Sequence, residues 1–160
     1  MKIIGIDPGL IQTGFGIINI NDNDISMIDY GIIKPDPKAN LPIRLLTIFE
    51  DIVQIINDYK PEVFVIEEVF YSKNVKSTMR LGQARGSAMV AAASKNMIIY
   101  EYSPRKIKQA VTGNGNAHKS QVQFMVKTKL KMDHVPEPID ASDALAVALC
   151  YENQFRENDL

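Results

Sequence analysis

Four acidic residues stand at positions where their side chains could meet and bind a metal ion. Asp7 ends an isoleucine-rich run, KIIGID, and Glu67 closes a second apolar run, VFVI, which is typical of a strand buried on both faces. If these strands are parallel neighbours, both carboxylates emerge at the carboxyl edge of the sheet, where open α/β sheets usually bind ligands. Asp140 and Asp143 are three residues apart and project from one side of a predicted helix. The rest of that helix is almost purely apolar, so we expect it to hold both carboxylates against the protein body.

Carboxylates gathered in this way favour hard divalent cations. Four ionised groups repel one another unless cations neutralise them, and oxygen-only ligands suit Mg²⁺ or Mn²⁺. Two such ions about 3.5–4 Å apart can stabilise both the attacking and the leaving oxygen in phosphodiester hydrolysis. A simpler explanation is that acidic residues are favoured in the first turn of any helix. It accounts easily for one of Asp140 and Asp143, and less easily for both, but it does not account for acids that close two apolar strands.

The elements that must position these residues follow an α/β pattern. Strands are predicted over residues 2–7, 15–20, 25–34, 63–66 and 97–102. The polar NDND turn joins the second and third strands into a hairpin. Helices are predicted from Pro42 to the residues before Pro61, over 77–95, from Pro104 after a Ser103 cap, over 119–132 and over 139–152. We therefore expect one domain, residues 1–160, with a mixed five-stranded sheet and helices on both faces.

Charge is distributed unevenly along the chain, although the net charge is only -1. Residues 1–59 carry 4 Lys/Arg and 8 Asp/Glu, residues 60–131 carry 13 and 4, and residues 132–160 carry 1 and 7. A basic middle third between acidic ends could build one phosphate-binding face. The alternative is a pair of solvated lysine-rich helices, and the charge distribution alone does not decide between the two.

Several classes of protein are disfavoured by composition. The single cysteine, Cys150, lies in an apolar stretch and is expected to be buried, and neither His118 nor His134 has a partner at metal-ligand spacing. No apolar run is long enough to span a membrane, and Asp7 interrupts the N-terminal apolar segment that a signal peptide would need. We expect a cytoplasmic protein with no membrane partner.

Five motifs, in order along nearly the whole chain, resemble the RuvC family of crossover-junction endonucleases. They are GIDPG at 5–9, IEEVF at 66–70, LGQARG at 81–86, VTGNGNAHKSQV at 111–122 and DASDALAVA at 140–148. The resemblance implies a ribonuclease-H-like fold and a homodimer that resolves four-way (Holliday) DNA junctions by paired symmetric cuts in recombination and repair. It also implies Mg²⁺, two ions per subunit with Mn²⁺ as a substitute, held by Asp7, Glu67, Asp140 and Asp143. The RuvA–RuvB branch-migration complex is the partner it implies.

The resemblance also implies DNA-binding roles for Phe70, Lys108 and Lys119. Phe70 matches an aromatic residue that disturbs base pairing near the junction point, and a wedge of this kind unstacks bases at a cost of a few kcal/mol. The two lysines match basic residues near the scissile phosphate, and Gly113 and Gly115 fall in a flexible loop. From residue types alone, an aromatic just past a strand is more often part of the core, and each lysine an ordinary surface residue.

The small residues of the predicted helix over 77–95 have two explanations. Glycine in a helix costs about 1 kcal/mol relative to alanine, so Gly82 and Gly86 indicate that something approaches closely. Tight packing of the helix on the sheet is one explanation. The resemblance suggests the other, which is that the helix around Gly82 to Ala93 lies at or near a dimer interface. A bulky substitution at Ala88 is then expected to change dimerisation or fold stability.

Three other functions fit parts of the sequence. A related nuclease that acts on RNA–DNA hybrids or pre-ribosomal RNA would share the carboxylates but lack Phe70 and the TGNGNAHKSQV loop. A nucleotide-binding protein of the actin and sugar-kinase type would share the GIDPGLIQTGFG hairpin but needs two lobes, for which 160 residues are too few. A non-catalytic junction-binding module would have no need of four intact carboxylates.

Overall fold

Five strands form one mixed sheet in the computed structural model, which describes residues 1–22, 24–70 and 72–158. The strands are β1 (Lys2–Asp7), β2 (Thr13–Asn21), β3 (Asp24–Ile33), β4 (Val63–Glu67) and β5 (Ile98–Tyr102). Their order across the sheet is β3-β2-β1-β4-β5, with β1, β4 and β5 parallel and β2 antiparallel to both β1 and β3. The predicted hairpin is therefore confirmed, although residue 23 of its turn lies outside the described residues.

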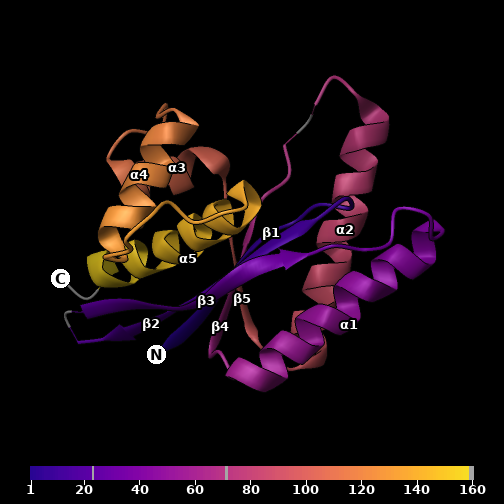
Figure 1. Cartoon of the computed structure of the whole chain (residues 1–160), viewed down its shortest axis with the longest axis horizontal. Coiled ribbons are helices and arrows are strands. Elements are labelled where there is room, and N and C mark those ends of the chain that lie inside the picture. The colour runs from indigo at the N-terminus through magenta and orange to yellow at the C-terminus, as the bar shows by residue number, and fades with distance from the viewer. Residues whose placement is uncertain (23, 71, 159–160) are drawn as a thin grey trace.

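Helices cover both faces of the sheet, as the sequence predicted. The helices are α1 (Leu41–Tyr59), α2 (Val75–Ser94), α3 (Pro104–Thr112), α4 (Lys119–Lys129) and α5 (Ile139–Asn158). Figure 1 shows α3, α4 and α5 on one side of the sheet and α1 and α2 on the other. Among the described residues, none of these helices is both long and apolar enough to span a membrane.

Alternating side chains of the strands supply two separate cores. Ile3 of β1 and Val65 of β4 face α5, whereas Ile4 and Phe64 face α1 and α2. All four are essentially inaccessible to solvent. Because Asp7 and Glu67 continue the alternation of Ile3 and Val65, their side chains leave the sheet on the α5 face.

Polar side chains cap the starts of α1 and α3, of which the Ser103 cap was predicted, and some helices differ in length from the prediction. The Asn40 side chain accepts a hydrogen bond from the Ile43 amide at the start of α1, and the Ser103 side chain accepts one from the Lys106 amide at the start of α3. The largest difference is α5, which continues six residues beyond its predicted end at 152. Stacking of Tyr151 on Phe155 and an ion pair between Glu152 and Arg156 support this extra length.

Candidate metal centre

The two strand-end carboxylates lie on adjacent strands. β1 and β4 pair in parallel with Gly5 opposite Val65 and Ile6 opposite Ile66, so Asp7 and Glu67 follow at the same edge. The carbonyl oxygen of Glu67 accepts a hydrogen bond of 3.1 Å from Arg85 Nε of α2. Arg85 also forms an ion pair with Glu101 at the end of β5. This contact fixes the backbone from which the Glu67 side chain projects.

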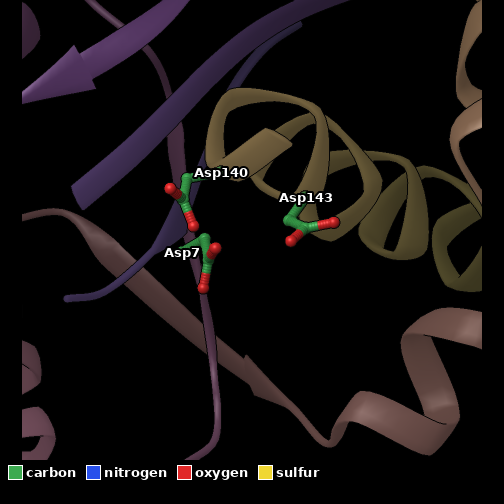
Figure 2. Close-up of side chains that lie close together, drawn as sticks. All are labelled: Asp7, Asp140 and Asp143. Carbon is green, nitrogen blue, oxygen red and sulfur yellow. The ribbon is translucent and has the colours of Figure 1, made fainter. Parts of the chain in front are cut away.

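Helix α5 brings two further carboxylates to this edge. One carboxylate oxygen from each of Asp7, Asp140 and Asp143 lies within 4.8 Å of the others. Figure 2 shows Asp7 beside Asp140 and Asp143, which project from the first turns of α5. Three oxygen ligands at this spacing fit a hard divalent cation.

The approach of α5 depends on glycines in the strands beneath it. A Cβ atom on Gly14, which pairs with Asp7 across β1 and β2, would lie 1.9 Å from the Asp140 carbonyl oxygen. A Cβ on Gly5 would lie 2.2 Å from the Ala144 carbonyl oxygen. Any other residue at these positions would push α5 away from the sheet and carry Asp140 and Asp143 away from Asp7.

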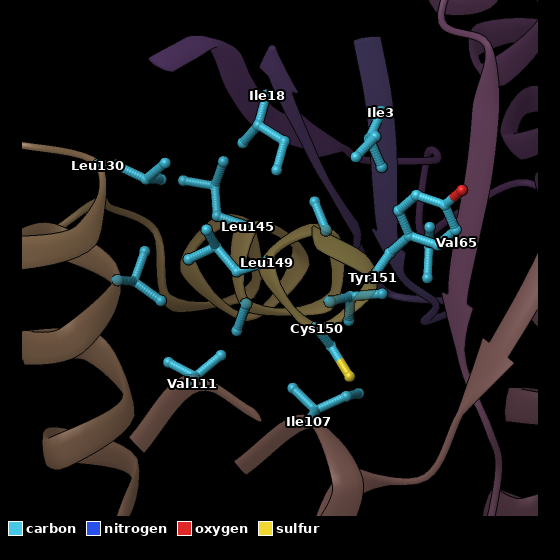
Figure 3. Packing of buried hydrophobic residues seen from close by; sticks show 14 of the residues in the cluster. Ile3, Ile18, Val65, Ile107, Val111, Leu130, Leu145, Leu149, Cys150 and Tyr151 are labelled. Atoms are coloured by element: carbon cyan, nitrogen blue, oxygen red, sulfur yellow. The ribbon is translucent and has the colours of Figure 1, made fainter. Parts of the chain in front are cut away.

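Helix α5 is held in place by burial along most of its length. Leu145 and Leu149 pack between the sheet and helices α3 and α4 (Figure 3). Cys150 is fully buried in the same cluster, as expected. Burial of each leucine contributes about 1.5–3 kcal/mol, so the start of α5, with its two aspartates, is attached to a rigid body.

Glu67 lies outside the group of three but in the same cavity. The cavity has a volume of about 370 Å³ and is lined by all four predicted carboxylates, by Lys108 of α3 and by Lys119 of α4. A side-chain hydrogen bond joins Asp7 and Glu67. The structure thus brings together the four carboxylates and two lysines singled out in the sequence.

Burial and mutual repulsion change the protonation of this cluster. Burial raises the pKa of Asp7 to about 9, and the negative charge of Glu67 is the next largest cause. Burial also raises the pKa of Glu67 and of Asp143, although the positive charge of Lys119 opposes the rise in both. Without a cation, Asp7 therefore holds its proton at neutral pH and donates it to the Glu67 carboxylate. A cation that binds here must displace that proton, so its affinity increases with pH.

The two lysines differ in their relation to the cluster. Lys119 Nζ is 3.8 Å from Asp143 Oδ2, and its side chain is 72% exposed. Lys108 is half-buried and lowers the pKa of Glu67 and Asp143 through its charge. Both lysines line the acidic cavity, where their charge can attract a phosphate that the carboxylates alone would repel.

One residue of the site was missed by the sequence analysis. The side-chain amide of Gln12, in the turn between β1 and β2, donates a hydrogen bond to Asp140 Oδ2. A glutamine in a polar turn carries no sequence signal for such a contact. Its partner lies 128 residues away and is reached only because α5 packs on this end of the sheet.

We predict that Gln12→Leu lowers the affinity of the cluster for Mn²⁺ by about 10–100-fold, because loss of a residue that orients a metal ligand typically has this effect. Isothermal titration with Mn²⁺ at fixed pH measures the change. Gln12→Glu is compared with Gln12→Leu, because it also removes the amide donor but in addition changes the charge of the cluster by adding another carboxylate. Unchanged Mn²⁺ affinity in Gln12→Leu would show that the amide does not orient Asp140.

Phe70 lies in the connection between β4 and α2, three residues after Glu67. Its side chain is 61% exposed. The expectation that the ring is exposed is confirmed, and packing in the core, the alternative drawn from residue type, is wrong. The ring is on the same connection as the end of β4 and therefore near the edge that carries the carboxylates.

Helix α2 has two different small-residue faces. Ala84, Ala88 and Ala91 are fully buried against α1 and the sheet, whereas Gly82 and Gly86 face open space. Tight packing on the sheet thus explains the alanines but not the glycines. Ala88 is buried in this chain's own core, so a larger side chain there would lower the stability of the fold and would not by itself report on a dimer interface.

Comparison with known proteins identifies the family. The model for "Crossover junction endodeoxyribonuclease RuvC" matches residues 3–151. The chain belongs to the RuvC family. RuvC of Halothermothrix orenii is 45% identical over 158 residues, which cover 99% of this chain and 96% of that protein. RuvC of Alkaliphilus oremlandii is 48% identical over 151 residues, which cover 94% and 92% respectively.

Solved structures agree with this assignment and with the predicted ribonuclease-H-like fold. Thermus thermophilus RuvC in complex with a Holliday junction substrate has a TM-score of 0.93 and 29% identity, and the match covers 99% of this chain and 96% of that one. A second Thermus thermophilus RuvC structure has a TM-score of 0.91 and 28% identity. The RuvC fold therefore extends over essentially the whole chain.

Proposed function

We propose that this RuvC-family chain is a metal-dependent endodeoxyribonuclease that resolves four-way DNA junctions by paired, symmetric strand cuts. The proposal is supported by its relatives, which are named crossover junction endodeoxyribonucleases, and by the junction-bound RuvC structure that shares its fold. The observation that carries it is the cavity in which Asp7, Glu67, Asp140 and Asp143 converge beside Lys108 and Lys119. In this proposal residues 1–160 act as one nuclease domain.

The four carboxylates are proposed to hold Mg²⁺, with two ions per subunit and Mn²⁺ as a substitute. When bound, such ions supply an activated water and stabilise the charge of the phosphate that is cut. The chain's own residues hold the ligand oxygens at fixed positions on β1, β4 and α5. Lys119 exchanges its contact with Asp143 for a contact with the incoming phosphate, and Lys108 provides a second positive charge. Water attacks phosphorus as one P–O bond of the cut strand breaks, so that the phosphate keeps the OH of the water and the released sugar oxygen gains a proton.

Two cuts related by a two-fold axis call for two such sites, and we propose that a C2 homodimer supplies them. The face of α2 opposite its buried alanines carries Val75, Met79 and Val90, which are 65%, 62% and 60% exposed. Gly82 and Gly86 lie between them on the same face. An exposed apolar stripe with glycines at its centre fits a second α2 helix that approaches closely. Partnership with the RuvA–RuvB complex and action in the cytoplasm are proposed by analogy with the family.

The function is tested by incubation with Mg²⁺ and three substrates of equal length: a four-way junction, a linear duplex and an RNA–DNA hybrid. Preferential cutting of the junction, at symmetric positions on two strands, is expected. Preferential cutting of the hybrid would favour the related ribonuclease instead. A chain that binds the junction but leaves it intact with Mg²⁺ or Mn²⁺ would be a junction-binding module.

We predict that Phe70→Ala slows cleavage of a fully paired junction by about tenfold. Unstacking of bases costs a few kcal/mol per step, and the variant loses the aromatic wedge that offsets this cost. Junctions with unpaired bases at the crossover should be cut almost as fast as by the wild type. Single-turnover rates on the two substrates measure this difference. Phe124→Ala is the matched control, because the Phe124 side chain on α4 is also 61% exposed. Equal losses on both substrates would argue against a wedge.

A further inference from the structure

A second, smaller cavity lies on the other face of the sheet from the metal centre. Its volume is about 210 Å³. Three segments meet there: the turn between β1 and β2, the first turns of α1, and the first half of α2. The cavity is lined by Leu10, Ile11, Arg44, Ser77, Arg80 and Leu81. We call it the Arg44–Arg80 pocket.

Positive charge in this pocket is not balanced by any acidic residue of its lining. Arg44 Nη2 donates a hydrogen bond of 2.9 Å to the Leu10 carbonyl oxygen, but Arg44 Nε is buried without a partner among the described residues. Arg80 is exposed and forms no hydrogen bond or ion pair within residues 1–22, 24–70 and 72–158. A buried guanidinium donor without an acceptor is unfavourable, so the pocket is suited to a ligand that brings oxygen acceptors and negative charge.

The size and donors of the pocket indicate a single phosphate group. Guanidinium groups match phosphate oxygens in pairs, and the Ser77 hydroxyl adds a neutral donor. Sites for whole small-molecule ligands occupy about 300–1,000 Å³, so the pocket is too small for a nucleotide cofactor. Free phosphate and a phosphate of a DNA backbone share the required chemistry.

The position of the pocket favours a phosphate of DNA. Leu10 follows Asp7 by three residues, so their Cα atoms are at most about 11 Å apart. The metal centre and the pocket thus lie on opposite faces of the sheet but at the same edge, separated by the turn that contains Leu10 and Ile11. One DNA strand that crosses this edge can reach both, and Ile11, which is 75% exposed, lies between them.

We propose that the Arg44–Arg80 pocket binds one backbone phosphate of the junction DNA, within a few nucleotides of the phosphate that is cut. This assignment rests on the proposed function. The contact carries no sequence information, but it sets the register of the strand and so determines which phosphate reaches the carboxylates.

Arg80→Ala tests the pocket, because Arg80 is exposed and its removal leaves the Arg44 contact with Leu10 intact. We expect junction affinity to fall by about tenfold at 0.15 M salt, and the slope of log affinity against log salt to decrease by about one. Lys95→Ala is the control, since it removes one positive charge from the other end of α2, about 22 Å away along the helix. It should change affinity less than twofold. Equal melting temperatures for the two variants confirm that the fold is intact.

Single neutral methylphosphonates, placed in turn at the four phosphates on each side of the cut, then locate the contact. In the wild type and in Lys95→Ala, one position should weaken binding by about tenfold, and in Arg80→Ala, where only Arg44 remains, the same position should have a clearly smaller effect. Free phosphate is the other ligand that the pocket could bind, and competition between inorganic phosphate and the junction for the protein tests it. If phosphate binds in the pocket while every methylphosphonate has equal effects in all three proteins, the pocket takes free phosphate and the assignment to DNA is wrong.

Failure of this inference and failure of the proposed function give different results. A wild-type chain that does not bind the four-way junction overturns both. A wild-type chain that binds and cuts the junction, with an Arg80→Ala variant indistinguishable from Lys95→Ala, overturns the pocket assignment alone.

Discussion

Asp7→Asn is expected to reduce junction cleavage by at least about 10³-fold while junction binding is retained, a loss of roughly 4 kcal/mol of transition-state stabilisation. Asp7 is central to the cluster, since it is hydrogen-bonded to Glu67 and one of its carboxylate oxygens lies within 4.8 Å of oxygens of Asp140 and Asp143. Asparagine keeps the size of the side chain but removes the charge that binds a cation. Binding of DNA without metal is expected to be equal or tighter, because negative charge near the phosphate is lost.

Single-turnover cleavage with Mg²⁺ and junction binding without metal measure these two effects. Glu68→Gln is the matched control, because Glu68 is an exposed carboxylate adjacent to Glu67 that does not line the cavity. It should cut at nearly the wild-type rate. An Asp7→Asn variant that also cuts at nearly that rate would overturn the assignment of the metal site.

The same substitution should stabilise the protein when no metal is present. The folded pKa of Asp7, about 9, lies far above its value in the unfolded chain, about 3.9. Between these values the unfolded chain has released the proton and the folded chain has kept it, so rising pH progressively destabilises the fold. Asn carries no such penalty and can still donate a hydrogen bond to Glu67.

Thermal unfolding in EDTA at pH 8 should therefore show Asp7→Asn melting about 2–8 °C above the wild type, the shift that 1–2 kcal/mol produces in a protein of this size. The difference should vanish below about pH 3, where Asp7 is protonated in both the folded and the unfolded chain. Saturating Mg²⁺ should raise the melting temperature of the wild type more than that of the variant. A wild-type melting temperature that does not fall between pH 5 and 8 relative to the variant would contradict the raised pKa.

The edge that carries the site was predictable because it depends on local rules. Two apolar runs that end in acids, together with the alternation of side chains along a strand, are sufficient to place Asp7 and Glu67 on one face once β1 and β4 are adjacent. The spacing of Asp140 and Asp143 on a helix is equally local. Their distance to Asp7 is not local, because it depends on how closely α5 approaches Gly5 and Gly14, which in sequence are only weak strand formers.

Residues missed or misread share one property, which is that their role depends on a neighbour far away in the chain. Gln12 reaches Asp140 only in the folded protein. Arg44 belongs to the acidic first third of the sequence, yet it lies beside Arg80 of the basic segment. Ala88 and Gly86 are both small, but two residues along a helix separate them by about 200°, so Ala88 is buried in the core whereas Gly86 faces open space.

Gly86→Glu is expected to dissociate the proposed homodimer, raising its dissociation constant by at least about 100-fold. Because the two subunits contribute the same face, a Gly86→Glu dimer would have two new carboxylates in its interface. Each of them would lose its hydration without gaining a partner. The chain itself should tolerate the change, because a Cβ at Gly86 meets no atom within 4 Å. Replacement of a helical glycine should even add about 0.5–1 kcal/mol to the stability of α2.

Sedimentation velocity at micromolar concentration measures the oligomeric state, and a supercoiled plasmid with an extruded cruciform measures paired cutting. A dimer that cuts both strands in one encounter yields linear DNA, whereas separate monomers yield nicked circles first. Asn57→Glu, which places the same charge on the exposed side of α1, should behave as the wild type in both assays.

Ala88→Leu should instead lower the melting temperature, because Ala88 is fully buried in the chain's own core. A Gly86→Glu variant that sediments as a dimer and yields linear DNA would show that the pairing of subunits does not involve this face of α2.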